Sequence, residues 1–100
     1  MSSFMKLKFT KQSKQDLDDI WEYIARDNPS AADGFIDSLH GKCCMLAERP
    51  EIGKERPEIR LDIRSFPVGN YLIFYHLQDG IITIDRFLSG YRDIPNLFGD

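Results

Sequence analysis

The stretch YLIFYHLQDGIITIDRFL, residues 71–88, holds two apolar runs that are separated by Asp79-Gly80. An Asp-Gly pair between two such runs is a strong signal for a β-hairpin. The first run, 71–77, is apolar almost throughout, which is typical of a strand in the centre of a sheet. We therefore expect residues 71–77 and 81–88 to form two antiparallel strands, with the first of them in a central position.

The segments on either side extend this sheet. Residues 60–66 alternate polar and apolar side chains, which predicts a further strand, and residues 67–70 then turn the chain. Residues 51–58 alternate in charge sign and are expected to form a solvated loop. At the start of the chain, residues 4–9 alternate apolar and basic side chains, which predicts a short strand with one face in water. Residues 91–98 follow the last strand as a short tail.

Residues 16–25 have the apolar spacing of one helix face. The apolar positions recur at i, i+3, i+4 and i+7: Leu17, Ile20, Trp21 and Ile24. The preceding residues Ser13-Lys14-Gln15-Asp16 have the form of a capping box, so we expect the helix to begin at Ser13. Asp16, Asp18 and Asp19 would then lie in its first turn, where the helix dipole favours negative charge.

A second helix is predicted to follow Asn28-Pro29. Asn28 or Ser30 would cap it, Pro29 suits a first helical turn, and Arg49-Pro50 would end it. Its apolar stripe consists of Ala32, Phe35, Ile36, Leu39, Cys43 and Leu46. The element order is therefore β-α-α-β-β-β, an α+β fold with a helical hairpin packed on a small antiparallel sheet. We expect a single domain over residues 1–100, with residues 1–4 as a flexible extension.

Bulk composition limits the classes of function. The 100 residues carry 13 basic and 16 acidic side chains and a net charge of −3, which argues against binding nucleic acid by neutralising phosphates over the whole surface. No apolar run approaches the ~18 residues that span a bilayer, and the N-terminus lacks a secretory signal, so we expect a cytoplasmic protein. Cys43 and Cys44 are too close in the chain for an unstrained disulfide, which predicts two free thiols.

The sequence offers little catalytic chemistry. His40 and His76 do not have the spacing of a zinc site, and no phosphate loop, nucleophile elbow or H-E-x-x-H motif occurs. Cys43 falls on the apolar stripe of the second helix, where burial makes a thiol unreactive. We therefore predict no metal, no cofactor and no catalytic residue.

Four arginines follow the predicted sheet: Arg60, Arg64, Arg86 and Arg92. In the predicted strand, Arg60 and Arg64 would share one face. A guanidinium group presents a planar fork of donors that suits carboxylates and phosphates. Two interpretations stay open: these arginines pair with neighbouring aspartates on an exposed sheet face, or together they form a binding surface.

Three stretches, in this order along the chain, are similar to the ParE/RelE toxin superfamily of bacterial type II toxin–antitoxin modules. Residues 16–25 resemble the opening helix of ParE-type toxins, residues 64–75 their central hairpin, and residues 86–98 their closing strand and tail. The resemblance covers nearly the whole chain. It implies a cognate, ParD-like antitoxin whose C-terminal segment wraps around the toxin in a hetero-oligomer.

The superfamily contains two functional classes. RelE-type members are ribosome-dependent endoribonucleases that cut messenger RNA, whereas ParE-type members poison DNA gyrase. The sequence favours the ParE branch, because residues 51–100 contain six basic and eight acidic side chains, while phosphate contacts at a ribosome require a basic face. The tail also has Tyr91-Arg92 where a His-Arg pair is expected, and no Tyr follows Arg92.

The resemblance also implies site residues. For a gyrase poison that acts by binding, without catalysis and without specific contacts to nucleic acid, the target surface would consist of Arg64, Arg86, Tyr91 and Arg92. The antitoxin would bind along the helical hairpin and the sheet edge, against Tyr23, Phe66, Tyr71 and Phe87. Two alternatives stay open. One is a RelE-like ribonuclease with Tyr91 in proton transfer, and the other is an antitoxin-binding module with little or no toxicity.

Overall fold

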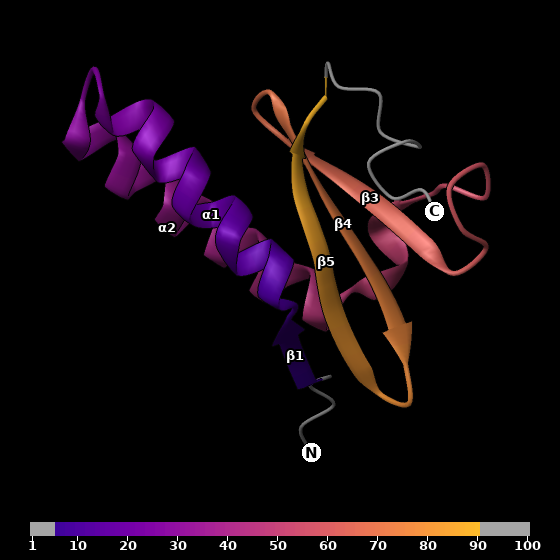
Figure 1. The fold of residues 1–100 in the computed structure, drawn as a ribbon. Coiled ribbons are helices and arrows are strands. Elements are labelled where there is room, and N and C mark those ends of the chain that lie inside the picture. Colours follow the sequence, from indigo (N-terminus) through magenta and orange to yellow (C-terminus); the bar gives the residue numbers. More distant parts are fainter. Residues whose placement is uncertain (1–5, 91–100) are drawn as a thin grey trace.

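Two helices pack on a five-stranded sheet in the computed structural model, which describes residues 6–90 (Figure 1). The elements, in chain order, are β1 (Lys6–Phe9), α1 (Lys11–Ala25), α2 (Pro29–Glu48), the 3-10 turn η1 (Pro50–Ile52), β2 (Lys54–Glu55), β3 (Ile63–Val68), β4 (Tyr71–Gln78) and β5 (Ile81–Ser89). This order confirms the predicted α+β class. The loop expected at residues 51–58 differs from the prediction, because it contains part of η1 and the two-residue strand β2.

The strands lie in the order β1-β5-β4-β3-β2, and the pairing of β1 with β5 is parallel while the other pairings are antiparallel. The sheet is therefore mixed, and not antiparallel throughout as the sequence suggested. The helical hairpin accounts for this difference. Its second helix reverses the first and brings the chain back, so that β3 starts in the direction of β1, and β5 follows two reversals later in the same direction (Figure 1).

The main core lies between the helices and one face of the sheet. Side chains of both helices pack against sheet residues that include Ile73, Tyr75, Ile82, Ile84 and Phe87. Each apolar side chain that is fully buried stabilises the fold by roughly 1.5–3 kcal/mol relative to an exposed one. This layer therefore provides most of the apolar stabilisation.

Strand β4 is buried on both faces, as its apolar sequence predicts. Ile73, Phe74 and Tyr75 follow one another in the chain and are all fully buried. Because successive side chains of a strand point to opposite faces, Phe74 belongs to a second, smaller cluster with Ile63 and Leu88. The hairpin after β4 is also as predicted: Asp79 and Gly80 have φ angles of 54° and 74°, as a tight turn with two left-handed residues requires.

Helix α1 begins earlier than predicted, and the prediction that Ser13 caps it is wrong. Thr10 is the N-cap: its Oγ1 accepts a hydrogen bond from the Ser13 N–H at 3.0 Å, and the Ser13 hydroxyl donates to the Thr10 carbonyl at 2.9 Å. The Thr10 hydroxyl also donates to the Asp85 carbonyl of β5 at 2.9 Å. One residue thus ends β1, caps α1 and holds both to β5.

The earlier start moves Asp16 out of the first turn, which contains no acidic residue. The cap of the second helix is as predicted: the Asn28 side chain accepts from the Ala31 N–H at 3.0 Å, and Pro29 is the first residue of α2.

Asp16 is nearly buried and connects α1 to the edge of β5. Strand β1 pairs with β5 only as far as Ile84, so within residues 6–90 the edge of β5 has no partner strand beyond that residue. The Asp16 carboxylate lies alongside this edge. It accepts hydrogen bonds from the Phe87 N–H at 3.0 Å and from Nε and Nη2 of Arg86 at 2.8 and 3.0 Å.

Replacing Asp16 with Asn is expected to lower the free energy of unfolding by about 3 kcal/mol, because it leaves the largely buried Arg86 guanidinium without a counter-charge. Urea unfolding followed by circular dichroism measures the change. Asp19→Asn is the matched control on an exposed turn of α1 and should change stability by less than about 0.5 kcal/mol. A similar small effect of both substitutions would contradict the structural role of Asp16.

Candidate functional site

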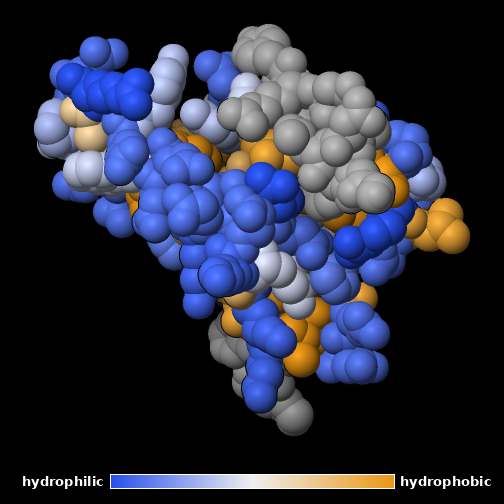
Figure 2. Space-filling view, in the orientation of Figure 1, coloured by the Kyte–Doolittle hydropathy of each residue, from blue (hydrophilic) through white to orange (hydrophobic). Residues whose placement is uncertain are grey.

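A groove of about 970 Å³ separates the helical hairpin from the β3–β4 turn and the end of β5. Its apolar lining comes from four elements and consists of Ile20, Ile24, Phe35, Tyr71, Phe87 and Leu88. Figure 2 shows apolar surface in the hollow between the helices and the sheet, bordered by hydrophilic residues. Such a groove suits an apolar segment of another molecule better than a small polar ligand.

Two aromatic rings form one wall of the groove. The ring centroids of Phe35 on α2 and Tyr71 at the start of β4 lie 5.6 Å apart. Gly69 in the β3–β4 turn has a φ of 58°, and a Cβ there would lie 3.4 Å from the Phe35 ring. Glycine therefore allows the turn both its left-handed backbone and its close approach to α2.

Charged residues form the α1 side of the groove. Asp19 and Glu22 line it in the second half of α1, and Arg26 lines it just past the end of the helix. Between them stands Tyr23, whose side chain is 67% exposed. The rim is therefore negative over about one helical turn and positive at the end near the helix C-terminus.

The structure brings together three of the four residues predicted to bind the antitoxin. Tyr23, Tyr71 and Phe87 all line the groove. Phe66 packs against the main core, outside the lining. Phe87 is almost completely buried, so it forms the floor, whereas Tyr23 is accessible from solvent. Their role in binding stays a prediction.

The predicted target surface is not gathered in one place. Arg86 lines the groove, bound to Asp16. Arg64 lines a separate pocket, where Nη1 donates to the Gly53 carbonyl at 2.7 Å and Nη2 to Glu55 at 3.1 Å. Tyr91 and Arg92 lie outside the described residues.

The prediction that Arg60 shares a strand face with Arg64 is wrong. Strand β3 begins at Ile63, and residues 56–62 form turns in which the Ile63 N–H donates to the Arg60 carbonyl at 3.3 Å. The Arg60 side chain folds back over the sheet instead. Alternation in the sequence did not reveal this turn, because a turn can also alternate polar and apolar residues.

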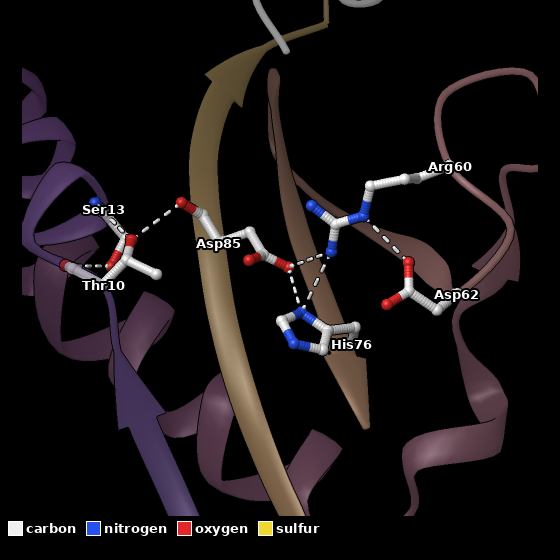
Figure 3. A network of polar contacts seen from close by, with 6 residues as sticks. All are labelled: Thr10, Ser13, Arg60, Asp62, His76 and Asp85. Atoms are coloured by element: carbon white, nitrogen blue, oxygen red, sulfur yellow. Dashed lines mark hydrogen bonds and ion pairs between the residues drawn. The ribbon is translucent and has the colours of Figure 1, made fainter. Parts of the chain in front are cut away.

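Arg60 belongs to a polar network on the sheet (Figure 3). Its pairing with Asp62 and Asp85 agrees with the first interpretation of the arginines, whereas the part played by His76 was not predicted. Its Nε donates to Asp62 at 2.9 Å, and its Nη2 lies 3.3 Å from His76 Nδ1 and 3.8 Å from Asp85. His76 Nδ1 lies 2.7 Å from the Asp85 carboxylate. Asp85 is the extra residue of a bulge in β5, because Tyr75 pairs with Ile84 and Phe74 with Arg86.

Burial and ion pairing shift the pKa values of the two carboxylates of this network in opposite directions. Burial raises the pKa of Asp85, despite the neighbouring His76. The hydrogen bond from Arg60 lowers the pKa of Asp62, which is largely exposed.

The buried thiol of Cys43 does not have the environment of a nucleophile. Both cysteines are free, as predicted, with Cys43 buried and Cys44 exposed. Burial raises the pKa of Cys43 to about 12, so its reactive thiolate is scarce at neutral pH. Within residues 6–90, no group of three or more His, Cys, Asp or Glu side chains is arranged to hold a metal ion. No helix in this part of the chain is long and apolar enough to cross a membrane.

Comparison with known proteins identifies the family. Residues 7–94 match the family described as the ParE toxin of the type II toxin–antitoxin system parDE. The chain belongs to the ParE toxin family. The resemblance seen in the sequence is therefore confirmed, and the chain is a toxin of a type II toxin–antitoxin system.

Two curated ParE toxins of Caulobacter vibrioides are similar in sequence. Toxin ParE1 is 30% identical over 71 residues, which are 70% of this chain and 74% of that protein. Toxin ParE3 is 23% identical over 91 residues, covering 90% of this chain and 91% of that protein.

Two solved structures share the fold. The chromosomal ParDE system from P. aeruginosa matches with a TM-score of 0.75 and 22% identity over 88% of this chain and 98% of that one. The toxin–antitoxin complex RelBE2 from Mycobacterium tuberculosis matches with a TM-score of 0.59 and 19% identity, covering 86% and 98%. Both ParE and RelE toxins thus have this arrangement of helices and strands.

Proposed function

We propose that this ParE-family toxin inhibits DNA gyrase by binding to it, and that a cognate ParD-like antitoxin neutralises the toxin by occupying the groove between α1 and the sheet. Family membership over residues 7–94 carries the proposal. The groove supports the second part, because it is large enough for a peptide segment and has an apolar floor.

Tyr23 is the main candidate for an anchor in the groove. Aromatic side chains that become buried on binding often contribute most of the affinity of an interface. Tyr23 is 67% exposed in the free chain, so contact with a partner would bury much of a large ring. The Phe35–Tyr71 wall faces the same groove and offers aromatic surface to the partner.

Ion pairing among the arginines favours gyrase over messenger RNA as the target. Every arginine between residues 50 and 90 is bonded to a carboxylate: Arg56 to Glu58, Arg60 to Asp62, Arg64 to Glu55 and Arg86 to Asp16. A ribonuclease needs guanidinium groups that are available to phosphate oxygens. These four guanidinium groups are already bound to carboxylates, which suits contact with a protein better than contact with phosphates.

A supercoiling assay tests the proposed target. The purified chain, shown to be folded by circular dichroism, should inhibit gyrase and cause linear, cleaved DNA to accumulate. Arg92→Ala should abolish this inhibition without changing affinity for the antitoxin, since Arg92 belongs to the proposed target surface. Messenger RNA should remain intact during growth arrest. An inert wild-type chain, or cleaved messenger RNA, would refute gyrase as the target.

Tyr23→Ala tests the groove as the antitoxin site. We expect it to weaken binding of the co-encoded antitoxin at least tenfold, because removal of an aromatic anchor typically costs 2 kcal/mol or more. Isothermal titration calorimetry measures the dissociation constant. Trp21→Ala, an exposed aromatic of the same helix outside the groove, is the matched control and should bind normally. Equal affinities of the wild type and the Tyr23 variant would contradict the proposal.

A further inference from the structure

A second apolar surface lies away from the groove, around the turn that precedes β3. Of the large aliphatic side chains in residues 6–90, three are exposed: Leu61 by 90%, Leu77 by 44% and Ile52 by 39%. Leu61 and Leu77 both line a pocket of about 350 Å³, and Ile52 follows another lining residue, Glu51. Single exposed leucines are common, but two that line one pocket, with Ile52 next to the lining residue Glu51 in the chain, form a larger apolar feature.

The turn that carries Leu61 is held in place on both sides of that residue. The Ile63 N–H donates to the Arg60 carbonyl at 3.3 Å, which closes the turn across Leu61 and Asp62. The Arg60 and Asp62 side chains are joined at 2.9 Å, and Arg60 continues to His76 and Asp85 (Figure 3). Leu61 is thus presented to solvent by a rigid turn, and binding through it requires little further ordering.

The neighbouring η1 turn is equally constrained. The Tyr75 hydroxyl donates to the Pro50 carbonyl at 2.8 Å and accepts from the Gly53 N–H at 2.9 Å. A Cβ at position 53 would collide with this hydroxyl, so only glycine fits there. Ile52 lies between these two contacts and is fixed with them.

The rim of the pocket is negatively charged. Glu51, Glu55 and Asp62 line it. Arg64 also lines it and Arg60 is paired with Asp62, so three acidic side chains stand against two arginines. The Arg64 guanidinium is already bonded to the carbonyls of Glu51 and Gly53 and to the Glu55 carboxylate. The hydrogen bond from Arg60 lowers the pKa of Asp62 and keeps its carboxylate ionised.

From these features we infer that the Leu61 surface, defined as Ile52, Leu61 and Leu77 with the acidic rim, docks the protein target of the toxin. The matching site on the target is an apolar pocket, bordered by Lys or Arg, that receives Leu61. The described residues that line this surface do not overlap those that line the groove, so contacts to the target and to the antitoxin are separable. This inference rests on the proposed function as a toxin that acts by binding.

Charge excludes a second copy of the chain as the preferred occupant. A symmetric contact through Leu61 would bring two acidic rims together, and like charges across an interface oppose association. A basic rim on the target instead attracts Glu51, Glu55 and Asp62.

Charge variants of Leu61 test this assignment in the full-length toxin. Leu61→Lys and Leu61→Asp should each raise the toxin concentration for half-inhibition of gyrase supercoiling at least tenfold, and Lys should be the more damaging because it repels a basic rim. Because Leu61 is 90% exposed, the unfolding temperature and the affinity for the antitoxin should not change. Ser38→Asp, at an exposed position of α2 outside both surfaces, is the control and should inhibit like wild type.

Each outcome decides between the inference and the proposed function. Full inhibition by both Leu61 variants would overturn the docking surface and leave the gyrase proposal intact. If the wild type arrests growth without inhibiting gyrase, the gyrase proposal fails. Full growth arrest by both Leu61 variants would then overturn the docking surface, and weakened growth arrest would support it. A wild type that does neither refutes both. A wild-type dimer that Leu61→Lys dissociates, with inhibition unchanged, would assign the surface to a second copy.

Discussion

Asp16 joins the helical layer to the sheet at the point where the edge strand β1 stops. One carboxylate accepts a backbone N–H of β5 and two N–H groups of Arg86, so a helix side chain binds the edge of β5 just beyond the end of its pairing with β1. An unpaired strand edge and a buried guanidinium are each unfavourable alone. Together with the Thr10 bond to the Asp85 carbonyl, this contact fixes where α1 lies relative to β5.

The position of α1 in turn creates the groove. Strand β1 covers β5 only as far as Ile84. Beyond that residue, α1 contributes the opposite wall of the groove with Ile20, Tyr23 and Ile24. The Asp16–Arg86 pair is part of the lining, so an interaction needed for stability also shapes the candidate antitoxin site. The Leu61 surface also depends on a stabilising interaction. The polar network of Figure 3 binds the turn before β3 to the sheet, and the same turn exposes Leu61 to solvent.

Features that depend on neighbouring residues were predictable from the sequence. They include the Asp79-Gly80 hairpin, the buried strand around Phe74 and the Asn28 cap. The N-cap of α1 was not predictable in this way, because Thr10 and Ser13 both carry a hydroxyl group. Thr10 is held in place by its hydrogen bond to the carbonyl of Asp85, which is 75 residues away in the chain. Arg86 was correctly singled out, but its partner Asp16 is 70 residues distant and looked like a first-turn residue. Family resemblance indicated Tyr23, Tyr71 and Phe87, whereas the Leu61 surface required knowing that β3 begins at Ile63.

The toxin is thus proposed to use two separate surfaces, the groove for the antitoxin and the Leu61 surface, together with Arg92, for the target. Hydrogen exchange of the free toxin and its antitoxin complex compares them in one experiment. We predict that the antitoxin slows exchange of backbone amides at residues 19–26, 69–71 and 87–89, while residues 59–62 exchange as in the free chain. Protection at residues 59–62 with none at the groove would contradict the assignment.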